Sequence, residues 1–142
     1  MTYVPDGHRF PASCPYGSSP DGDQAIAIGW LDGDHTFPAG SVPDGFVAAL
    51  SELGGHEVNV MRGVHPCGFC PQPHDPSDLQ PWIYARSKSA GEYLLGHGEI
   101  HVRGIDGQLF AAPTLVVHYV DAHQYRPPDA FIDAVLKSAG AD

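Results

Sequence analysis

Hydrophobic residues alternate with other residues in several short stretches of the chain, a pattern typical of half-buried strands. In residues 24–31, Ile26, Ile28 and Trp30 occupy every second position, which predicts a strand that buries these three side chains. Residues 99–103 alternate in the same way. Further short strands are predicted at residues 58–61, 80–86 and 92–95.

A hairpin is predicted in the C-terminal half of the chain. Ile100 and Val102 share one face of the strand at residues 99–103, and Asp106-Gly107 is a dipeptide typical of tight hairpin turns. The turn would lead the chain back into a strand at residues 108–111.

One internal helix is predicted at residues 43–53. Phe46, Leu50 and Leu53 recur there at the spacing that places apolar side chains on one helical face. The pair Gly54-Gly55 follows directly, and glycine is the residue that most often ends a helix.

Two helices are predicted near the C-terminus. The first begins at Pro113 and must end before Pro127-Pro128, because proline cannot continue a helix. The second covers about residues 128–139, with Asp129 near its start and Lys137 in its last turn, where each charge complements the helix dipole.

The order of these elements predicts an α+β fold, in which a small and mainly antiparallel sheet carries one internal helix and two C-terminal helices. The chain has 142 residues, a length typical of a single domain with its own core. The 17 glycines and 14 prolines predict many turns. Because these residues are frequent near the N-terminus, we expect an extended arm or loop at 1–23 and a globular body at 24–142.

The net charge of −10 argues against a nucleic-acid partner, because a field of this sign repels phosphate backbones. No apolar stretch is long enough to span a membrane, and the first residues lack the pattern of a signal peptide. We therefore expect a cytoplasmic protein with no membrane association. A protein partner is compatible with the acidic composition, but the sequence does not locate its surface, nor does it indicate an oligomeric state.

Cys67 and Cys70 are the most informative residues of the chain. Two thiolates two residues apart can bind one tetrahedral metal ion, and Gly68 between them gives the backbone the freedom that a tight turn needs. A redox pair of the thioredoxin type is the alternative. It is less favoured here, because such a pair opens a helix and three prolines follow Cys70 within six residues.

His118 and His123 are the histidines that best complete such a site. Their spacing matches the one that accompanies a cysteine pair in closed zinc sites, and a Cys2His2 set selects Zn²⁺ over Mg²⁺ or Ca²⁺. On an ideal helix the two side chains would point about 140° apart, so both can reach one ion only if the helix loosens near His123. The alternative is that both histidines are ordinary core or capping residues.

Two other residues compete for the remaining metal positions. His74 lies four residues after Cys70 in the same proline-rich loop and offers a local third ligand. Cys14 could supply a third thiolate, although an unremarkable thiol in the N-terminal arm is the simpler interpretation.

A small metalloenzyme of the hydrolase type is the alternative to a structural zinc site. It would have three protein ligands and a water in the fourth position, with Glu99 or His101 beside it as catalytic candidates. Zinc nucleobase deaminases combine His-x-Glu with Pro-Cys-x-x-Cys, and this chain contains both, but in the reverse order. The simpler interpretation is that Glu99 and His101 lie on a solvated strand face.

The segment HPCGFCP, together with the stretch from Gly98 to Val135, resembles a family of small bacterial proteins known only as hypothetical proteins. That stretch contains APTLVVHYVDAHQYRPP, which includes both His118 and His123. The resemblance implies a free-standing bacterial protein and carries no particular activity. The residues therefore predict a small zinc-binding protein, either a binding or regulatory module with a structural metal or the metalloenzyme.

Overall fold

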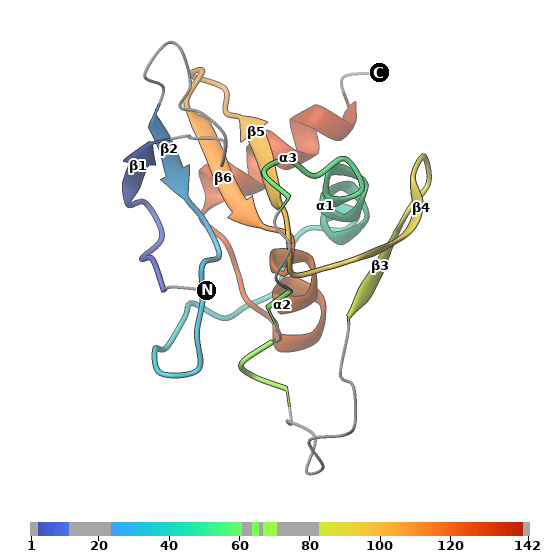
Figure 1. The fold of residues 1–142 in the computed structure, drawn as a ribbon. Coiled ribbons are helices and arrows are strands. Elements are labelled where there is room, and N and C mark those ends of the chain that lie inside the picture. Colours follow the sequence, from blue (N-terminus) through green and yellow to red (C-terminus); the bar gives the residue numbers. More distant parts are fainter. Residues whose placement is uncertain (1–2, 12–23, 61–63, 66, 71–82, 141–142) are drawn as a thin grey trace, which may run out of the picture.

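The computed structural model of the protein describes residues 3–11, 24–60, 64–65, 67–70 and 83–140. Within these residues the chain forms a four-stranded sheet, a separate two-stranded sheet and three α-helices (Figure 1). The α+β class predicted from the sequence is therefore confirmed.

The four-stranded sheet has the strand order β1-β2-β6-β5. Two of its three pairings are antiparallel, whereas β2 and β6 run parallel with Ile26 opposite Phe110. The sheet is thus mainly antiparallel, as predicted, with one parallel pairing that the sequence did not indicate. Its strands are β1 (Arg9–Pro11), β2 (Gln24–Ala27), β5 (Glu99–Arg103) and β6 (Leu109–Pro113).

The predicted hairpin at Asp106-Gly107 is confirmed. It joins β5 to β6, and Gly107 has the positive φ of 85° that such a turn requires. At the other edge of the sheet, β1 lies within the segment that was expected to be an extended arm or loop.

The predicted buried face of β2 is only partly right. Ile28 is buried, but Ile26 and Trp30 are half-buried, and the fully buried side chains of the strand are those of Ala25 and Ala27. The alternation stops at Gly29, whose φ is +74° and whose backbone lies so close to α2 that an added Cβ would be 2.6 Å from Val116 Cγ2.

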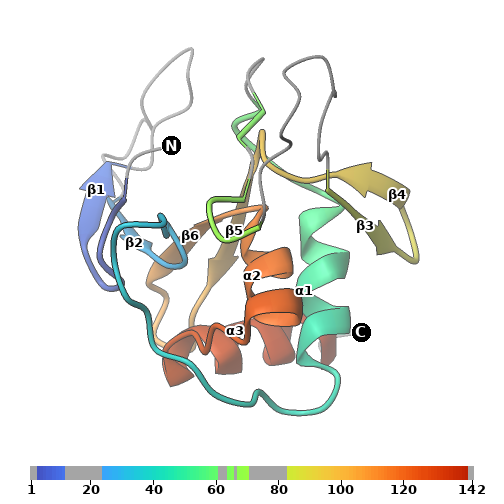
Figure 2. The same ribbon diagram turned by 90° about the horizontal axis from the view of Figure 1, so that it is seen from below.

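The helix α1 (Phe46–Gly54) begins three residues later than predicted. Gly45 has a left-handed backbone with φ 85°, which is incompatible with a right-handed helical turn at that position. The helix packs against α2, α3 and a second hairpin (Figure 2), and this hairpin consists of β3 (Tyr84–Ser87) and β4 (Gly91–Leu94).

The two C-terminal helices are α2 (Val116–His123) and α3 (Asp129–Gly140). The sequence predicted that the first of them would begin at Pro113, but Pro113 is the last residue of β6 and pairs with Glu99 across the hairpin. Strand pairing therefore delays the start of α2 by three residues. No helix in the described part of the chain is long and apolar enough to span a membrane.

The strand predicted at residues 58–61 is reduced to one isolated bridge. Val58 pairs with Glu99 at the edge of β5, and Asn59 then has a positive φ of 52° that interrupts an extended strand. Met61 lies outside the described residues.

Candidate metal centre

The Cys67–Cys70 segment forms a turn that is held against two other parts of the chain. Just before it, the His65 amide donates a hydrogen bond to the Gly96 carbonyl at 2.9 Å. A Cβ added at Gly68 would lie 3.3 Å from the backbone nitrogen of Gly33, so the two backbones nearly touch. The turn therefore has little room for a side chain at Gly68.

The histidines come from α2, which ends at His123. Gln124 follows in a left-handed conformation with φ 58°, and its amide and that of Tyr125 both donate to the Tyr119 carbonyl. At this helix end, the Nε2 atoms of His118 and His123 lie 3.2 Å apart despite the five-residue spacing. The helix ends at His123, the position near which it was predicted to loosen.

The structure brings together the four residues that the sequence analysis selected as metal ligands. The Sγ atom of Cys70 lies 3.2 Å from His118 Nε2 and 3.5 Å from His123 Nε2, and Cys67 Sγ lies 3.3 Å from His123 Nε2. All four candidate ligand atoms lie within 4.8 Å of one another.

These separations can be compared with those around a tetrahedral zinc ion. With Zn–S near 2.3 Å and Zn–N near 2.05 Å, ligand atoms would be about 3.4 Å apart for two nitrogens and about 3.6 Å for nitrogen and sulfur. The observed separations of 3.2–3.5 Å are within a few tenths of an ångström of these values. Four of the six separations in the group therefore match a tetrahedral site, and the other two are no longer than 4.8 Å, so the four side chains could hold a metal ion.

Aromatic rings cover one side of the cluster. Phe69 lies between the two cysteines in the sequence. The centroid of its ring is 5.5 Å from that of His123 and 5.7 Å from that of Tyr119. Phe37 packs on Phe69 from the other side at 5.1 Å. Cys67 belongs to the adjoining hydrophobic core and is 1% exposed, whereas Cys70 is partly exposed.

Burial favours the neutral forms of Cys67 and His118 while no cation is bound. Burial raises the pKa of the Cys67 thiol to about 11, against a smaller opposing effect of the Phe69 amide. Burial, followed by the neighbouring His123, lowers the pKa of His118. A bound cation would reverse the balance for the thiols, so binding should release protons.

The catalytic candidates Glu99 and His101 are not part of this group of four. They lie on β5, where His101 Nε2 is 2.9 Å from Glu99 Oε1, and Asn59 donates to the same oxygen at 3.3 Å. Both side chains are about one-fifth exposed, so the face they occupy is partly buried. The alternative ligands His74 and Cys14 lie outside the described residues.

A second acidic–histidine pair was missed by the sequence analysis. Glu57 Oε1 lies 3.6 Å from His97 Nε2, while Glu57 Oε2 and His97 Nδ1 are buried and have no hydrogen-bond partner among the residues that the structure describes. The Glu57 carboxylate occupies the space that a side chain at Gly98 would fill. Burial raises the pKa of Glu57, and His97 partly opposes this.

The His-x-Glu motif therefore does not act as one unit. Its histidine, His97, faces Glu57, and its glutamate, Glu99, hydrogen bonds to His101. Glu57 lies beside His97 because the neighbouring Val58 pairs with Glu99 in an isolated bridge. The sequence contains no signal for this pairing of two distant segments, so Glu57 could not be selected from it.

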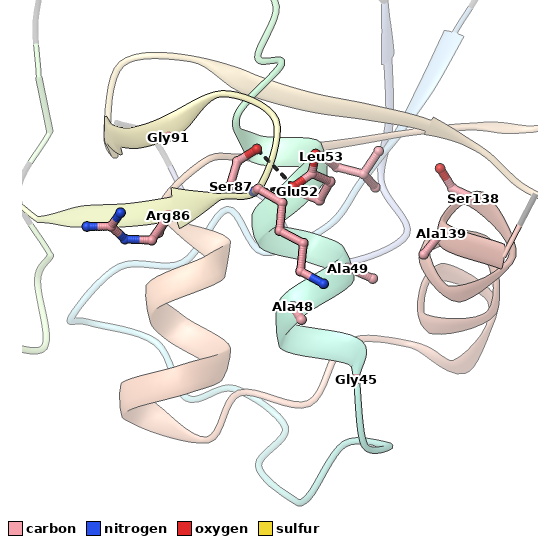
Figure 3. A pocket seen from close by; sticks show the side chains of 11 residues that line it. Gly45, Ala48, Ala49, Glu52, Leu53, Arg86, Ser87, Gly91, Ser138 and Ala139 are labelled. Carbon is pink, nitrogen blue, oxygen red and sulfur yellow. Dashed lines mark hydrogen bonds between the residues drawn. The ribbon is translucent and has the colours of Figure 1, made fainter. Parts of the chain in front are cut away.

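A cavity of about 860 Å³ lies elsewhere, between α1, the β3–β4 hairpin and the end of α3 (Figure 3). Glu52 forms part of its wall and accepts hydrogen bonds from the Ser87 hydroxyl at 2.9 Å and the Lys88 amide at 2.7 Å. The hydroxyls of Ser89 and Ser87 lower the pKa of Glu52 to about 2. None of the four candidate metal ligands lines this cavity, and its polar wall fastens the hairpin to α1.

Comparison with known proteins provides a family but no activity. No curated protein and no solved structure matches the chain. The family model described as "Domain of unknown function (DUF7919)" matches residues 2–136, and the chain therefore belongs to this family of uncharacterised proteins.

Proposed function

We propose that the protein binds one Zn²⁺ ion through Cys67, Cys70, His118 and His123, and that this ion is structural. The observation that supports the proposal is the convergence of two sulfur and two nitrogen atoms within 4.8 Å of one another.

The donor set favours zinc. Thiolate and imidazole ligands suit Zn²⁺, whereas Mg²⁺ and Ca²⁺ prefer oxygen ligands. Zn²⁺ also accepts four ligands at tetrahedral angles without a preference imposed by d-electrons. The metal would join a loop from the middle of the chain to α2 near its end.

Four protein ligands favour a structural ion over a catalytic one. A catalytic zinc usually keeps one position for water, and four protein side chains would fill the tetrahedron. Glu99 and His101, the acid–base candidates of the metalloenzyme alternative, hydrogen bond to each other outside the group.

We therefore propose a binding or regulatory module whose folded surface serves a protein partner and not a nucleic acid. A reducing bacterial cytoplasm would keep both thiols available for the metal.

Elemental analysis tests the proposal directly. Wild-type protein purified without chelator should contain about one zinc per chain, and Cys67→Ser and His118→Ala should lose most of it. His101→Ala is the matched control, because it removes a half-buried histidine outside the cluster and should retain the zinc.

Two results would change the proposal. A wild-type protein that contains no zinc and takes up none when zinc is added would overturn it. If His118→Ala kept its zinc and His74→Ala lost it, the cysteine pair would remain but the third ligand would come from its own loop.

A further inference from the structure

We propose that Cys70 is a site of oxidation by hydroperoxides, and that Cys67 then forms a disulfide with it and releases the metal. This inference rests on the zinc site proposed above. It adds a modification site and a chemical class of reactant, hydrogen peroxide or an organic hydroperoxide, to a site that otherwise only stabilises the fold.

The two cysteines differ in exposure to solvent. Cys67 is 1% exposed and belongs to the hydrophobic core, whereas Cys70 is partly exposed. A small polar oxidant therefore reaches Cys70 first. The Sγ atom of Cys67 belongs to the same group of ligand atoms, all within 4.8 Å of one another, and Cys67 is the other cysteine in the described part of the chain.

The chemistry is balanced by the peroxide alone. The Cys70 thiolate attacks one peroxide oxygen and breaks the O–O bond, which gives a sulfenic acid on Cys70 and hydroxide, or an alkoxide from an organic peroxide. The Cys67 thiolate then attacks the Cys70 sulfur, forms the S–S bond and expels a second hydroxide. The two leaving oxyanions take up two protons from the buffer, which gives two waters, or one water and one alcohol from an organic peroxide. Two thiolates are oxidised, one peroxide is reduced, and the zinc ion leaves as Zn²⁺.

The arrangement of the ligands explains why one disulfide would release the metal. Both sulfur ligands come from one turn and both nitrogen ligands from α2, so a single disulfide removes every ligand that the turn contributes. The two imidazoles of His118 and His123 alone bind zinc much more weakly than the full set. Oxidation would therefore remove the metal link between the turn and α2.

Aromatic packing favours a reversible reaction. Phe69 lies between the two cysteines in the sequence and contacts Phe37 and Tyr119, and none of these rings takes part in the oxidation. The turn should therefore stay near α2 after the metal leaves. Reduction would then restore a site that can bind zinc again.

The experiment uses the full chain with Cys14→Ser, so that Cys67 and Cys70 are the two remaining thiols. The zinc content is measured first, and one equivalent of hydrogen peroxide is then added in the presence of a chromogenic zinc chelator. We expect one zinc released per peroxide consumed, a monomer lighter by two hydrogens, and full reloading after dithiothreitol and zinc. Zinc that stays bound while peroxide is consumed, or oxidation to sulfinic acid or intermolecular dimers, would overturn the inference.

The order of attack is tested by trapping sulfenic acid with dimedone in zinc-free protein. The label should accumulate on Cys70 in Cys67→Ser, and several-fold less should appear on Cys67 in Cys70→Ser. Early-quenched wild-type protein, analysed by peptide mapping, gives the same comparison without a substitution. Equal labelling of the two cysteines would contradict the assignment of Cys70.

The initial zinc content separates the two proposals. Protein that binds one zinc but does not release it to peroxide retains the structural site and loses the oxidation site. Protein that binds no zinc overturns both.

Discussion

The Nε2 atom of His123 lies 3.3 Å from the Sγ atom of Cys67, although the two residues are 56 positions apart in the sequence. The contact joins the end of α2 to a turn in the middle of the chain. Any ion held there would act as a crosslink between these two segments.

Removal of the metal should therefore lower thermal stability. We expect a chelator to reduce the Tm of the wild type by roughly 10 °C or more, because the binding energy of a structural zinc contributes to folding. Cys67→Ser should melt near the chelated wild type and should no longer respond to chelator, whereas His101→Ala should respond like the wild type. Differential scanning calorimetry with and without chelator measures this. Identical wild-type melts in both conditions would show that no stabilising metal is bound.

Glu52 should make stability depend on pH in the acidic range. Its pKa is about 2 in the folded protein and near 4.5 without these contacts, because hydroxyl and amide groups of the hairpin stabilise the carboxylate. A lowered pKa contributes stability that is present above about pH 4.5 and is lost as the pH falls toward 2. Glu52→Gln should lower the Tm at pH 7 and reduce its decline below pH 4.5.

The control for Glu52→Gln is Glu92→Gln, a substitution in β4 of the β3–β4 hairpin that Glu52 contacts. Glu92 is largely exposed and lies 4.0 Å from Arg86, so its replacement should leave the melting profile nearly unchanged. Thermal melts between pH 2 and 7 decide the matter. If both variants followed the wild-type curve, the hydrogen bonds of Glu52 would have no role in attaching the hairpin.

Gly29→Ala should be among the more damaging glycine substitutions. The added methyl group would lie 2.6 Å from Val116 Cγ2 on a backbone with φ +74°, so overpacking adds to backbone strain. We expect a loss of about 2–4 kcal/mol in the free energy of unfolding. Gly107→Ala should cost only the backbone strain of about 1 kcal/mol, because φ is +85° and, apart from Gly107 and its two chain neighbours, no described residue has an atom within 4 Å of the added Cβ. Urea denaturation measures both, and equal losses would mean that the contact with Val116 relaxes freely.

Tyr125→Phe should loosen the N-terminal segment. The Tyr125 hydroxyl donates to Asp6 Oδ2 at 2.6 Å, and Asp6 Oδ1 accepts the Gly29 amide at 2.9 Å. Because Tyr125 is fully buried, loss of its hydroxyl should cost about 1–2 kcal/mol. Tyr84→Phe, at a residue that is 56% exposed, should have almost no effect. Urea denaturation of the two variants provides the comparison, and equal stability would argue that water replaces the hydroxyl.

Elements whose conformation depends on residues close to them in the sequence were predicted well. Alternation gave β5 with its observed bounds, and Asp106-Gly107 correctly indicated the turn that follows. The errors arose from contacts with distant segments. Pro113 belongs to β6 because it pairs with Glu99, and the buried face of β2 depends on how closely Gly29 approaches Val116.

In the candidate site, too, local spacing could be read from the sequence, whereas contacts between distant segments could not. The spacing of Cys67 and Cys70, and that of His118 and His123, is visible in the sequence, and the structure brings the two pairs together. Their role as zinc ligands stays a prediction. Glu57 carried no comparable signal, because it has no motif of its own and meets His97 only through the Val58–Glu99 bridge.

The parallel pairing of β2 with β6 also bears on how the chain folds. Ala25 pairs with Leu109, more than eighty positions later, whereas β5 and β6 are neighbours in the sequence. Closing the longer loop costs more conformational entropy, so the β5–β6 hairpin should form before β2 joins it. On the ribosome, β2 would then have β1 but not β6 as a partner until residues 109–113 have been synthesised and released from the exit tunnel.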